Sequence, residues 1–237
     1  MTEFSGIKAL VFDVFGTVVD WRGSVIREGE KLGKEKGLDT DWAAFADEWR
    51  GRYKPSMDRV RSGETSWRNL DALHRASLEE LLEEFEVTNL TEEEKDHLNR
   101  VWHRLDPWPD SVPGLTRLKR RYVISTLSNG NIALLTNMAK RAGLPWDMIF
   151  SAELVRHYKP APETYLMPPD LLGLHPEQVM LVAAHPSDLR AARSHGLRTA
   201  YVLRPLEWGP GVEPEEPDSS FDIVANDFAE LAEKLGA

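Results

Sequence analysis

Four short polar segments carry the side chains of this sequence that are best suited to chemistry. They offer carboxylates, an amine, an imidazole, hydroxyls and an amide, and they are Asp13 to Thr17, Leu127 to Asn131, Tyr158 to Pro160 and Ala183 to Asp188. A carboxylate with a cation close by stays ionised and can act as a nucleophile. An imidazole can exchange protons near neutral pH. Such chemistry requires that elements far apart in the sequence bring these segments together.

The first segment follows a short apolar run. Residues 7–12 are rich in Ile, Leu, Val and Phe, which predicts a buried strand. Asp13 stands where this strand ends and a turn containing Gly16 begins. A carboxylate there is costly unless it is paired or hydrogen-bonded. Two interpretations are open at this point, because Asp13 either caps the turn, as Asp commonly does, or is held there for function.

The second half of the chain alternates short apolar runs with helical patterns. We predict strands over 122–127, 148–151, 179–184, 199–203 and 222–224, and helices over 131–142, 162–172, 186–195 and 227–235. This order implies an α/β fold with a doubly wound, Rossmann-like parallel sheet. The carboxyl ends of the strands in such a sheet meet at one crevice, so we expect the four polar segments to converge there. That expectation favours the functional interpretation of Asp13.

Residues 20 to about 105 contain no convincing strand. Helices are predicted over 24–36, 40–62, 66–87 and 91–105, and Thr91 to Glu94 has the pattern of a capping box. We therefore predict an α/β core domain of residues 1–19 and 106–237. Residues 20–105 are predicted to form an inserted, all-helical cap domain over the carboxyl edge of the sheet. The Pro- and Glu-rich residues 205–220 are predicted to be a surface loop.

Composition excludes several classes of function. The 237 residues include no cysteine, which excludes disulfides, thiolate catalysis and Cys-based zinc sites. A formal net charge of −10 disfavours a nucleic-acid partner. No apolar run has membrane-spanning length, and the N-terminus lacks a basic region typical of a signal peptide. We therefore expect a cytoplasmic enzyme that acts on a small molecule.

The four segments, in this order, resemble the motifs of the haloacid dehalogenase superfamily, and specifically its type II members, the L-2-haloacid dehalogenases. The resemblance covers essentially the whole chain, including the cap. It places Asp13 as the nucleophile, with Thr17 four positions later. The matches to the second, third and final motifs are Ser128 with Asn129, then Lys159, then Asp188.

Two departures indicate the branch of the superfamily. Its phosphatases carry a second Asp two positions after the nucleophile, where this chain has Phe15. They also carry paired acids that hold Mg²⁺, whereas residues 183–188 offer only Asp188. A hard divalent cation prefers several oxygen ligands, so we expect no metal and no other cofactor. A Mg²⁺-dependent phosphatase remains the alternative, and a non-catalytic binding protein is the third hypothesis.

The resemblance implies hydrolytic dehalogenation of short 2-haloalkanoic acids. Asp13 would attack carbon 2 of the substrate, expel halide and form an ester. Water would then release the 2-hydroxy acid, inverted at carbon 2. Lys159 would keep Asp13 ionised, Ser128 would bind the substrate carboxylate and Asn129 the halide. The resemblance also suggests a homodimer, for which amphipathic cap helices can supply an interface.

Further residues are assigned roles at the same site. A cap arginine contacts the substrate or halide in the family, and Arg50 matches its position best, with Arg22 as the rival. His185 stands where type II relatives carry Asn, and we hypothesise that it is the base that activates water. Asp188 would orient Lys159 or this water. Tyr165 and Phe15 are expected to line the substrate site.

Overall fold

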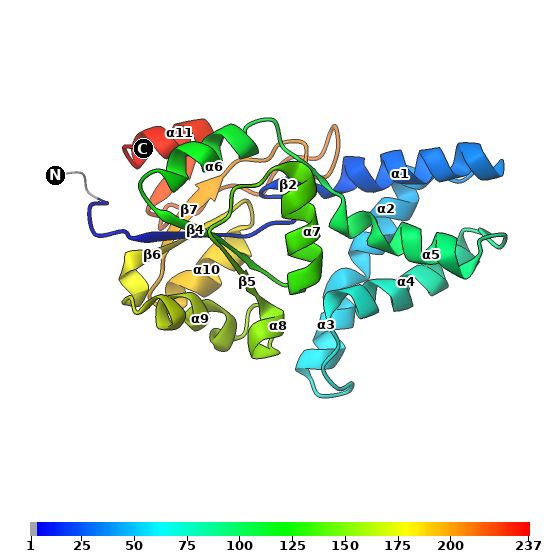
Figure 1. The fold of residues 1–237 in the computed structure, drawn as a ribbon, viewed down its shortest axis with the longest axis horizontal. Helices are drawn as coiled ribbons and strands as arrows, with labels where there is room; N and C mark the ends of the chain where they lie inside the picture. Colours follow the sequence, from blue (N-terminus) through cyan, green and yellow to red (C-terminus); the bar gives the residue numbers. More distant parts are fainter. Residues whose placement is uncertain (1–3) are drawn as a thin grey trace.

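The computed structural model describes residues 4–237, which form a six-stranded parallel sheet beside a group of helices (Figure 1). The order of the strands in the sheet is β5-β4-β1-β6-β7-β8. Their bounds are β1 Ala9–Phe12, β4 Val123–Ser128, β5 Met148–Ser151, β6 Val179–Ala183, β7 Arg198–Val202 and β8 Ile223–Ala225. The predicted α/β class and parallel sheet are therefore confirmed.

Strand β1 lies in the middle of the sheet and is buried along its whole length. Its last residue, Phe12, is paired with Thr126 of β4 on one side and Val182 of β6 on the other. From β4 the chain continues outward to β5, and it then crosses to β6, β7 and β8 on the opposite side. The winding direction reverses at β1, and the crevice of such a sheet opens at that point, where Asp13 follows.

Helices cover both faces of the sheet. One apolar cluster joins Leu10 and Phe12 to α6, α7 and α11, whereas the other joins Ala9 and Val11 to α9 and α10. This alternation is the two-residue period of a strand that is buried on both faces. The bounds of these helices are α6 Ser111–Lys119, α7 Ile132–Ala142, α9 Pro162–Leu172, α10 Pro186–Ser194 and α11 Phe228–Lys234, and the short α8 spans Ala152–Val155.

Helices α1 to α5, between β2 (Val19–Asp20) and β3 (Asp106–Pro107) in the sequence, lie to one side of the sheet and form a separate layer (Figure 1). Their bounds are α1 Trp21–Lys36, α2 Trp42–Gly51, α3 Tyr53–Arg61, α4 Leu70–Glu84 and α5 Glu92–Asn99. A two-stranded antiparallel ribbon of β2 and β3 joins this layer to the sheet. We call helices α1 to α5 the cap. The predicted capping box at Thr91 is confirmed, since both of its hydrogen bonds with Glu94 are present.

The helices differ from the sequence predictions in two places. The helix predicted over 40–62 is two helices, α2 and α3, which meet at Arg52. Helix α6, Ser111–Lys119, was not among the predicted helices. Pro113 occupies its first turn, where no backbone N–H is needed for an intrahelical hydrogen bond. None of the helices in residues 4–237 is both long and apolar enough to cross a membrane.

Candidate active site

A cavity of about 450 Å³ lies between the carboxyl edge of the sheet and the cap. Core residues on its wall are Asp13, Phe15, Asn129, Lys159, Pro160, Tyr165, His185, Ser187, Asp188 and Trp208, and cap residues are Arg50, Tyr53, Lys54, Met57 and Arg61. The loops after β1, β4, β5, β6 and β7 all contribute. The four polar segments predicted from the sequence therefore do converge.

Asp13, Lys159 and Asp188 form a largely buried charge cluster. The Nζ of Lys159 lies 3.3 Å from Oδ1 of Asp13 and 2.6 Å from Oδ2 of Asp188. The Tyr165 hydroxyl donates to Oδ1 of Asp188 at 2.6 Å. Burial raises the pKa of Asp13, but the charge of Lys159 and hydrogen bonds from His185 and Thr17 outweigh burial and hold that pKa well below its usual range. Asp13 is consequently ionised at neutral pH, as a nucleophile must be.

Thr17 fixes the second oxygen of Asp13. Its Oγ1 lies 2.9 Å from Oδ2 of Asp13 and accepts a hydrogen bond from the backbone N–H of Ala184 at 2.9 Å. Because that N–H supplies the hydrogen to Oγ1, the hydroxyl proton of Thr17 is directed to Asp13. The turn after β1 is thereby tied to the end of β6.

His185 lies between two carboxylates. Its Nδ1 is 3.1 Å from Oδ2 of Asp13, and its Nε2 is 2.9 Å and 3.1 Å from the two oxygens of Glu207. Burial lowers the pKa of His185, but the charge of Glu207 and the hydrogen bonds and charge of Asp13 outweigh burial and raise it to about 10. The ring is therefore protonated at neutral pH, and a base role requires that it first lose a proton.

Asn129 presents its amide to the cavity. Its Oδ1 accepts from the backbone N–H of Lys159 at 2.8 Å, which leaves the NH₂ group as its donor toward a ligand. Ser128 is fully buried behind it, and its Oγ accepts from the N–H of Gly130 at 3.1 Å. The Ser128 side chain is not on the cavity wall, so its contact with a substrate carboxylate stays a prediction.

The two candidate arginines have different surroundings. Arg50 lies on the cavity wall with its guanidinium 4.3 Å from the centroid of the Tyr53 ring, and its buried Nη1 has no hydrogen-bond partner. A buried donor without a partner is costly and is satisfied when an anion binds. Arg22 instead forms a two-point ion pair with Asp47, with N···O distances of 2.7 Å and 2.8 Å. Arg50 is thus the arginine that is available to a ligand.

A family model described as haloacid dehalogenase-like hydrolase matches residues 7–196. The chain belongs to the haloacid dehalogenase-like hydrolases. It is similar to the structure of the defluorinating L-2-haloacid dehalogenase Rha0230, with a TM-score of 0.95, 48% identity, and coverage of 100% of this chain and 98% of that one. It is also similar to the structure of the L-2-haloacid dehalogenase PA0810, with a TM-score of 0.94, 47% identity, and coverage of 97% of this chain and 99% of that one. The (S)-2-haloacid dehalogenase 4A of Burkholderia cepacia is 28% identical over 95% of this chain and 93% of its own.

Sequence reasoning missed several residues at the site of this hydrolase. Glu207 was placed in a surface loop, yet it is only 4% exposed and contacts His185. Its position shortly after β7 was an available signal, because ligands bind where the strands of such a sheet end. Trp208 lies on the cavity wall beside it. Tyr53 and Met57, from α3 in the cap, also line the cavity. Nothing in the sequence beyond their helical spacing indicated that they would.

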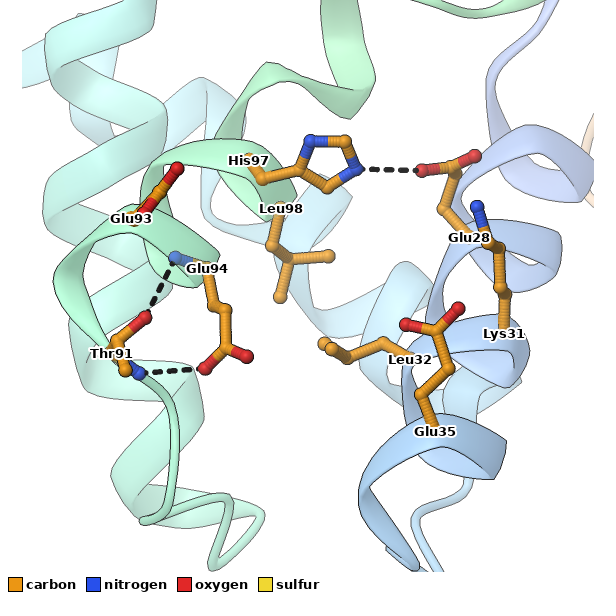
Figure 2. Close-up of a pocket in the computed structure, with 9 residues that line it drawn as sticks. All are labelled: Glu28, Lys31, Leu32, Glu35, Thr91, Glu93, Glu94, His97 and Leu98. Atoms are coloured by element: carbon orange, nitrogen blue, oxygen red, sulfur yellow. Dashed lines mark hydrogen bonds and ion pairs between the residues drawn. The ribbon is translucent and has the colours of Figure 1, made fainter.

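The haloacid dehalogenase-like chain has a second cavity, of about 400 Å³, between α1 and α5 in the cap (Figure 2). Four glutamates line it, and two of them, Glu28 and Glu94, have ionic or hydrogen-bond partners. Glu28 is paired with Arg104 at 2.8 Å and lies 3.6 Å from His97, and Glu94 closes the Thr91 capping box. None of the residues that line this cavity lines the cavity that contains Asp13.

Proposed function

We propose that this protein hydrolyses short 2-haloalkanoic acids to 2-hydroxy acids through an ester of Asp13, with inversion at carbon 2. The observation that carries the proposal is an ionised, largely buried Asp13 held by Lys159 in a cavity where Phe15 stands two positions after it. A halide leaves without a proton, so an apolar side chain at Phe15 is compatible with this leaving group. The names of the similar proteins support the same reaction.

The first step is a displacement at carbon 2. The Oδ1 of Asp13 attacks this carbon, the carbon–halogen bond breaks, and halide leaves with the bonding electrons. The substrate carries a carboxylate, so both it and the developing halide need donors. Arg50 has an unpartnered Nη1, and the NH₂ group of Asn129 lies at the cavity wall beside Tyr53, which supports roles for both in holding these anions. Lys159 remains beside Oδ1 and prevents Asp13 from being protonated.

The second step is the attack of water on Cγ of the Asp13 ester. The hypothesis from the sequence makes His185 the base for this water, with Asp188 orienting Lys159 or the water. Esterification removes the charge of Asp13, which is one of the two carboxylates that raise the pKa of His185. The base role therefore depends on whether the ring loses a proton once the ester has formed.

A Mg²⁺-dependent phosphatase is the alternative, and the site supports it less well. Phe15 occupies the position of the acid that would protonate an alkoxide leaving group. The ammonium group of Lys159 lies between the carboxylates of Asp13 and Asp188, the residues that a cation would have to bridge. A non-catalytic binding protein, the third hypothesis, would have no need of so complete a charge cluster.

The deciding experiment is an assay of halide release. The purified protein is incubated with each enantiomer of 2-chloropropionate, and chloride and lactate are measured. We expect equal amounts of chloride and lactate from the (S) enantiomer only. A generic phosphate ester, with and without Mg²⁺, is the parallel assay. Phosphate release without chloride release would overturn the proposal in favour of a phosphatase.

Fluoroacetate is a further substrate to be tested, because the similar protein Rha0230 is described as defluorinating. We propose that this chain also releases fluoride from fluoroacetate, more slowly than chloride from chloroacetate because fluoride is the poorer leaving group. A fluoride-selective electrode measures the release. Absence of fluoride under conditions of rapid chloride release would restrict the substrates to the heavier halogens.

Replacing Arg50 by methionine should lower kcat/KM for 2-chloropropionate by about 10²-fold or more, because a charge-assisted contact to a buried anion is lost. Arg22→Met is the matched comparison, since the pair of Arg22 with Asp47 lies away from the cavity wall. Its kcat/KM should change by no more than about threefold. The reverse ranking of the two variants would transfer the anion-binding role to Arg22.

The proposal also covers the oligomeric state of the protein and its location in the cell. We propose that the protein is a homodimer, that it acts in the cytoplasm, and that it needs no nucleic-acid partner. Light scattering after size-exclusion chromatography measures the mass of the assembly directly. A mass of about 27 kDa, that of one chain, would contradict the dimer.

A further inference from the structure

The surroundings of the His185 ring determine how many protons it carries. Both ring nitrogens face carboxylate oxygens, with Asp13 beyond Nδ1 at 3.1 Å and Glu207 beyond Nε2 at 2.9 Å. A neutral imidazole has one N–H and one lone pair, so it would turn a lone pair toward one of the two carboxylates. The doubly protonated ring donates to both. The raised pKa of His185, about 10, agrees with this geometry.

Glu207 is held firmly in its place. Its Oε1 accepts from the indole N–H of Trp21 at 3.3 Å, and its side chain is 4% exposed. Gly16 packs directly against it, because a Cβ added at Gly16 would lie 2.1 Å from Oε1 of Glu207. Gly16 also has φ +82°, where a side chain would be strained. Any side chain larger than that of glycine at position 16 would therefore displace the Glu207 carboxylate.

The segment that carries Glu207 is also fixed to the turn after β1. Arg204, three positions earlier, donates from Nε to the carbonyl oxygen of Thr17 at 2.7 Å. Its two terminal nitrogens pair with the carboxylate of Asp110 at 2.8 Å and 2.9 Å. The exit of β7 and the turn that bears Asp13 and Thr17 thus form one hydrogen-bonded unit, and Glu207 is part of it.

Two donors converge on one oxygen of Asp13. Thr17 Oγ1 and His185 Nδ1 both contact Oδ2, whereas Lys159 contacts Oδ1. When Oδ1 carries the substrate as an ester, Oδ2 is its carbonyl oxygen. Water adding to Cγ pushes the carbonyl electron pair onto Oδ2, which becomes an oxyanion. Fixed donors at the atom where charge develops are the strongest means of lowering such a barrier.

We propose that Glu207 is a positioning residue that keeps His185 doubly protonated and oriented, so that His185 and Thr17 form the oxyanion hole for hydrolysis of the Asp13 ester. The inference rests on the proposed function and assigns a role within it. As the tetrahedral intermediate collapses, the carbonyl of Asp13 re-forms and the bond between Cγ and Oδ1 breaks. One water proton ends on the departing alkoxide and the other passes to solvent, so Asp13 is restored as a carboxylate with one oxygen from water.

The oxyanion hole and the general base predict opposite dependences on pH. A donor must be protonated, so ester hydrolysis should be fastest at neutral pH and slow down as pH rises through the pKa of the ring. A base must be neutral, so hydrolysis should accelerate over the same range. Asp13 and Glu207 are the two charged groups that raise the pKa of His185, and only Glu207 keeps its charge in the ester.

The first experiment measures the ring without any substrate. Nitrogen-15 NMR of the imidazoles at pH 7 should show both nitrogens of His185 protonated in the wild type, with His185→Asn assigning the signal. In Glu207→Gln, the His185 ring should lose its proton at a pH that is lower than in the wild type by at least one unit. Glu213→Gln removes an exposed acid of the same loop and should leave the titration unchanged. A neutral His185 ring in the wild type at pH 7 would overturn the proposal.

The second experiment separates the two half-reactions. Rapid quenching with (S)-2-chloropropionate gives the burst of chloride, and mass spectrometry follows the mass added to Asp13 as it appears and decays. Glu207→Gln should slow the decay of the ester about 10²-fold, alter the chloride burst less than about threefold, and shift the fall in rate to lower pH. Glu207→Asp, which keeps the charge, should restore part of the decay rate.

Three results would count against this role. Ester decay that accelerates with pH in the wild type would make His185 a base. An equal loss of both half-reactions in Glu207→Gln, with an unchanged pH profile, would show that Glu207 only maintains the fold. Failure of the dehalogenase assignment would look different, because the wild type would then release no halide and gain no mass on Asp13, and the oxyanion role would fall with it.

Discussion

Asp13→Asn should lower kcat/KM for (S)-2-chloropropionate by at least about 10⁴-fold, because an amide oxygen is a far weaker nucleophile than a carboxylate. The side chain keeps its size, and Thr17 still has an oxygen to donate to. We therefore expect the variant to fold normally, as measured by circular dichroism and thermal unfolding. Chloride release gives the rate, and intact-protein mass spectrometry should detect no substrate bound to residue 13.

The control for Asp13 is Asp39→Asn, which removes an exposed carboxylate on the cap and should keep full activity. Asparagine at position 13 can deamidate back to aspartate, so residual activity has to be compared with the fraction of chains one mass unit heavier. Activity that clearly exceeds this fraction would mean that Asp13 is not the nucleophile. Hydrolysis would then proceed by direct attack of water on the substrate.

Lys159→Met should be the most damaging change to both activity and stability. Lys159 is 8% exposed and lies between the carboxylates of Asp13 and Asp188. Removing it leaves two buried anions close together without a cation, which costs about 3–5 kcal/mol of unfolding free energy. Activity should fall by about 10³-fold or more, because Asp13 is then ionised only at a cost. Urea unfolding and chloride release measure the two effects.

The loss of stability in Lys159→Met should depend on pH. Contacts with Lys159 and His185 keep the pKa of Asp13 below its value in the unfolded chain, so in the wild type this stabilisation is present above about pH 4 and decreases as pH falls. The variant lacks the stabilisation, and protonation of Asp13 relieves its unpaired charge. The difference in unfolding free energy between the two proteins should therefore narrow from pH 7 to pH 4.

Two comparison variants complete this test. Lys159→Arg keeps the charge, so it should retain more stability than Lys159→Met, although a planar guanidinium will not reproduce the position of Nζ and activity should remain low. Lys140→Met removes an exposed cation from α7 and should cost less than about 1 kcal/mol. If Lys159→Met were as stable as Lys140→Met, the charge cluster would not be the support that we describe.

Local sequence patterns were sufficient for the sheet and for the loops that follow it. The apolar run that ends at Phe12, and the glycines that end α7 and α9, Gly143 and Gly173, predicted elements within a residue or two of those observed. Periodicity and end signals of this kind depend only on neighbouring residues. Because strand ends converge in a parallel sheet, Asp13 and Lys159 could be placed together without any structure.

Burial that arises from distant contacts could not be predicted in this way. Glu207 lies in a stretch rich in Pro and Glu, a composition that predicts a solvent-exposed loop. It is buried because Arg204 fixes the segment to Thr17 and because Trp21, far away in the sequence, donates to its carboxylate. Of Arg204, Thr17 and Trp21, only Arg204 is close to Glu207 in the sequence. The local pattern was therefore correct for most of the loop and wrong for the residue that contacts His185.

The choice between the two arginines had the same difficulty. Asp47 stands three positions before Arg50 on α2, a spacing that favours a pair between them. The structure pairs Asp47 with Arg22 of α1 instead and leaves Nη1 of Arg50 without a partner. Which arginine is free for a substrate is decided by the packing of two cap helices, and the spacing of charges along one helix does not contain that information.

The central position of β1 affects the order in which parts of the protein fold during synthesis. This strand is synthesised before the other five strands of the sheet, and both its neighbours, beginning at Val123 and Val179, are made much later. Trp21 and Glu207 meet across 186 positions of the chain. Contacts of such separation form only after long loops close, whereas the helices of the cap contact one another locally. A chain still on the ribosome should thus contain a folded cap long before it can turn over a substrate, and activity should begin only after the segment that carries Glu207 and Trp208 has been made.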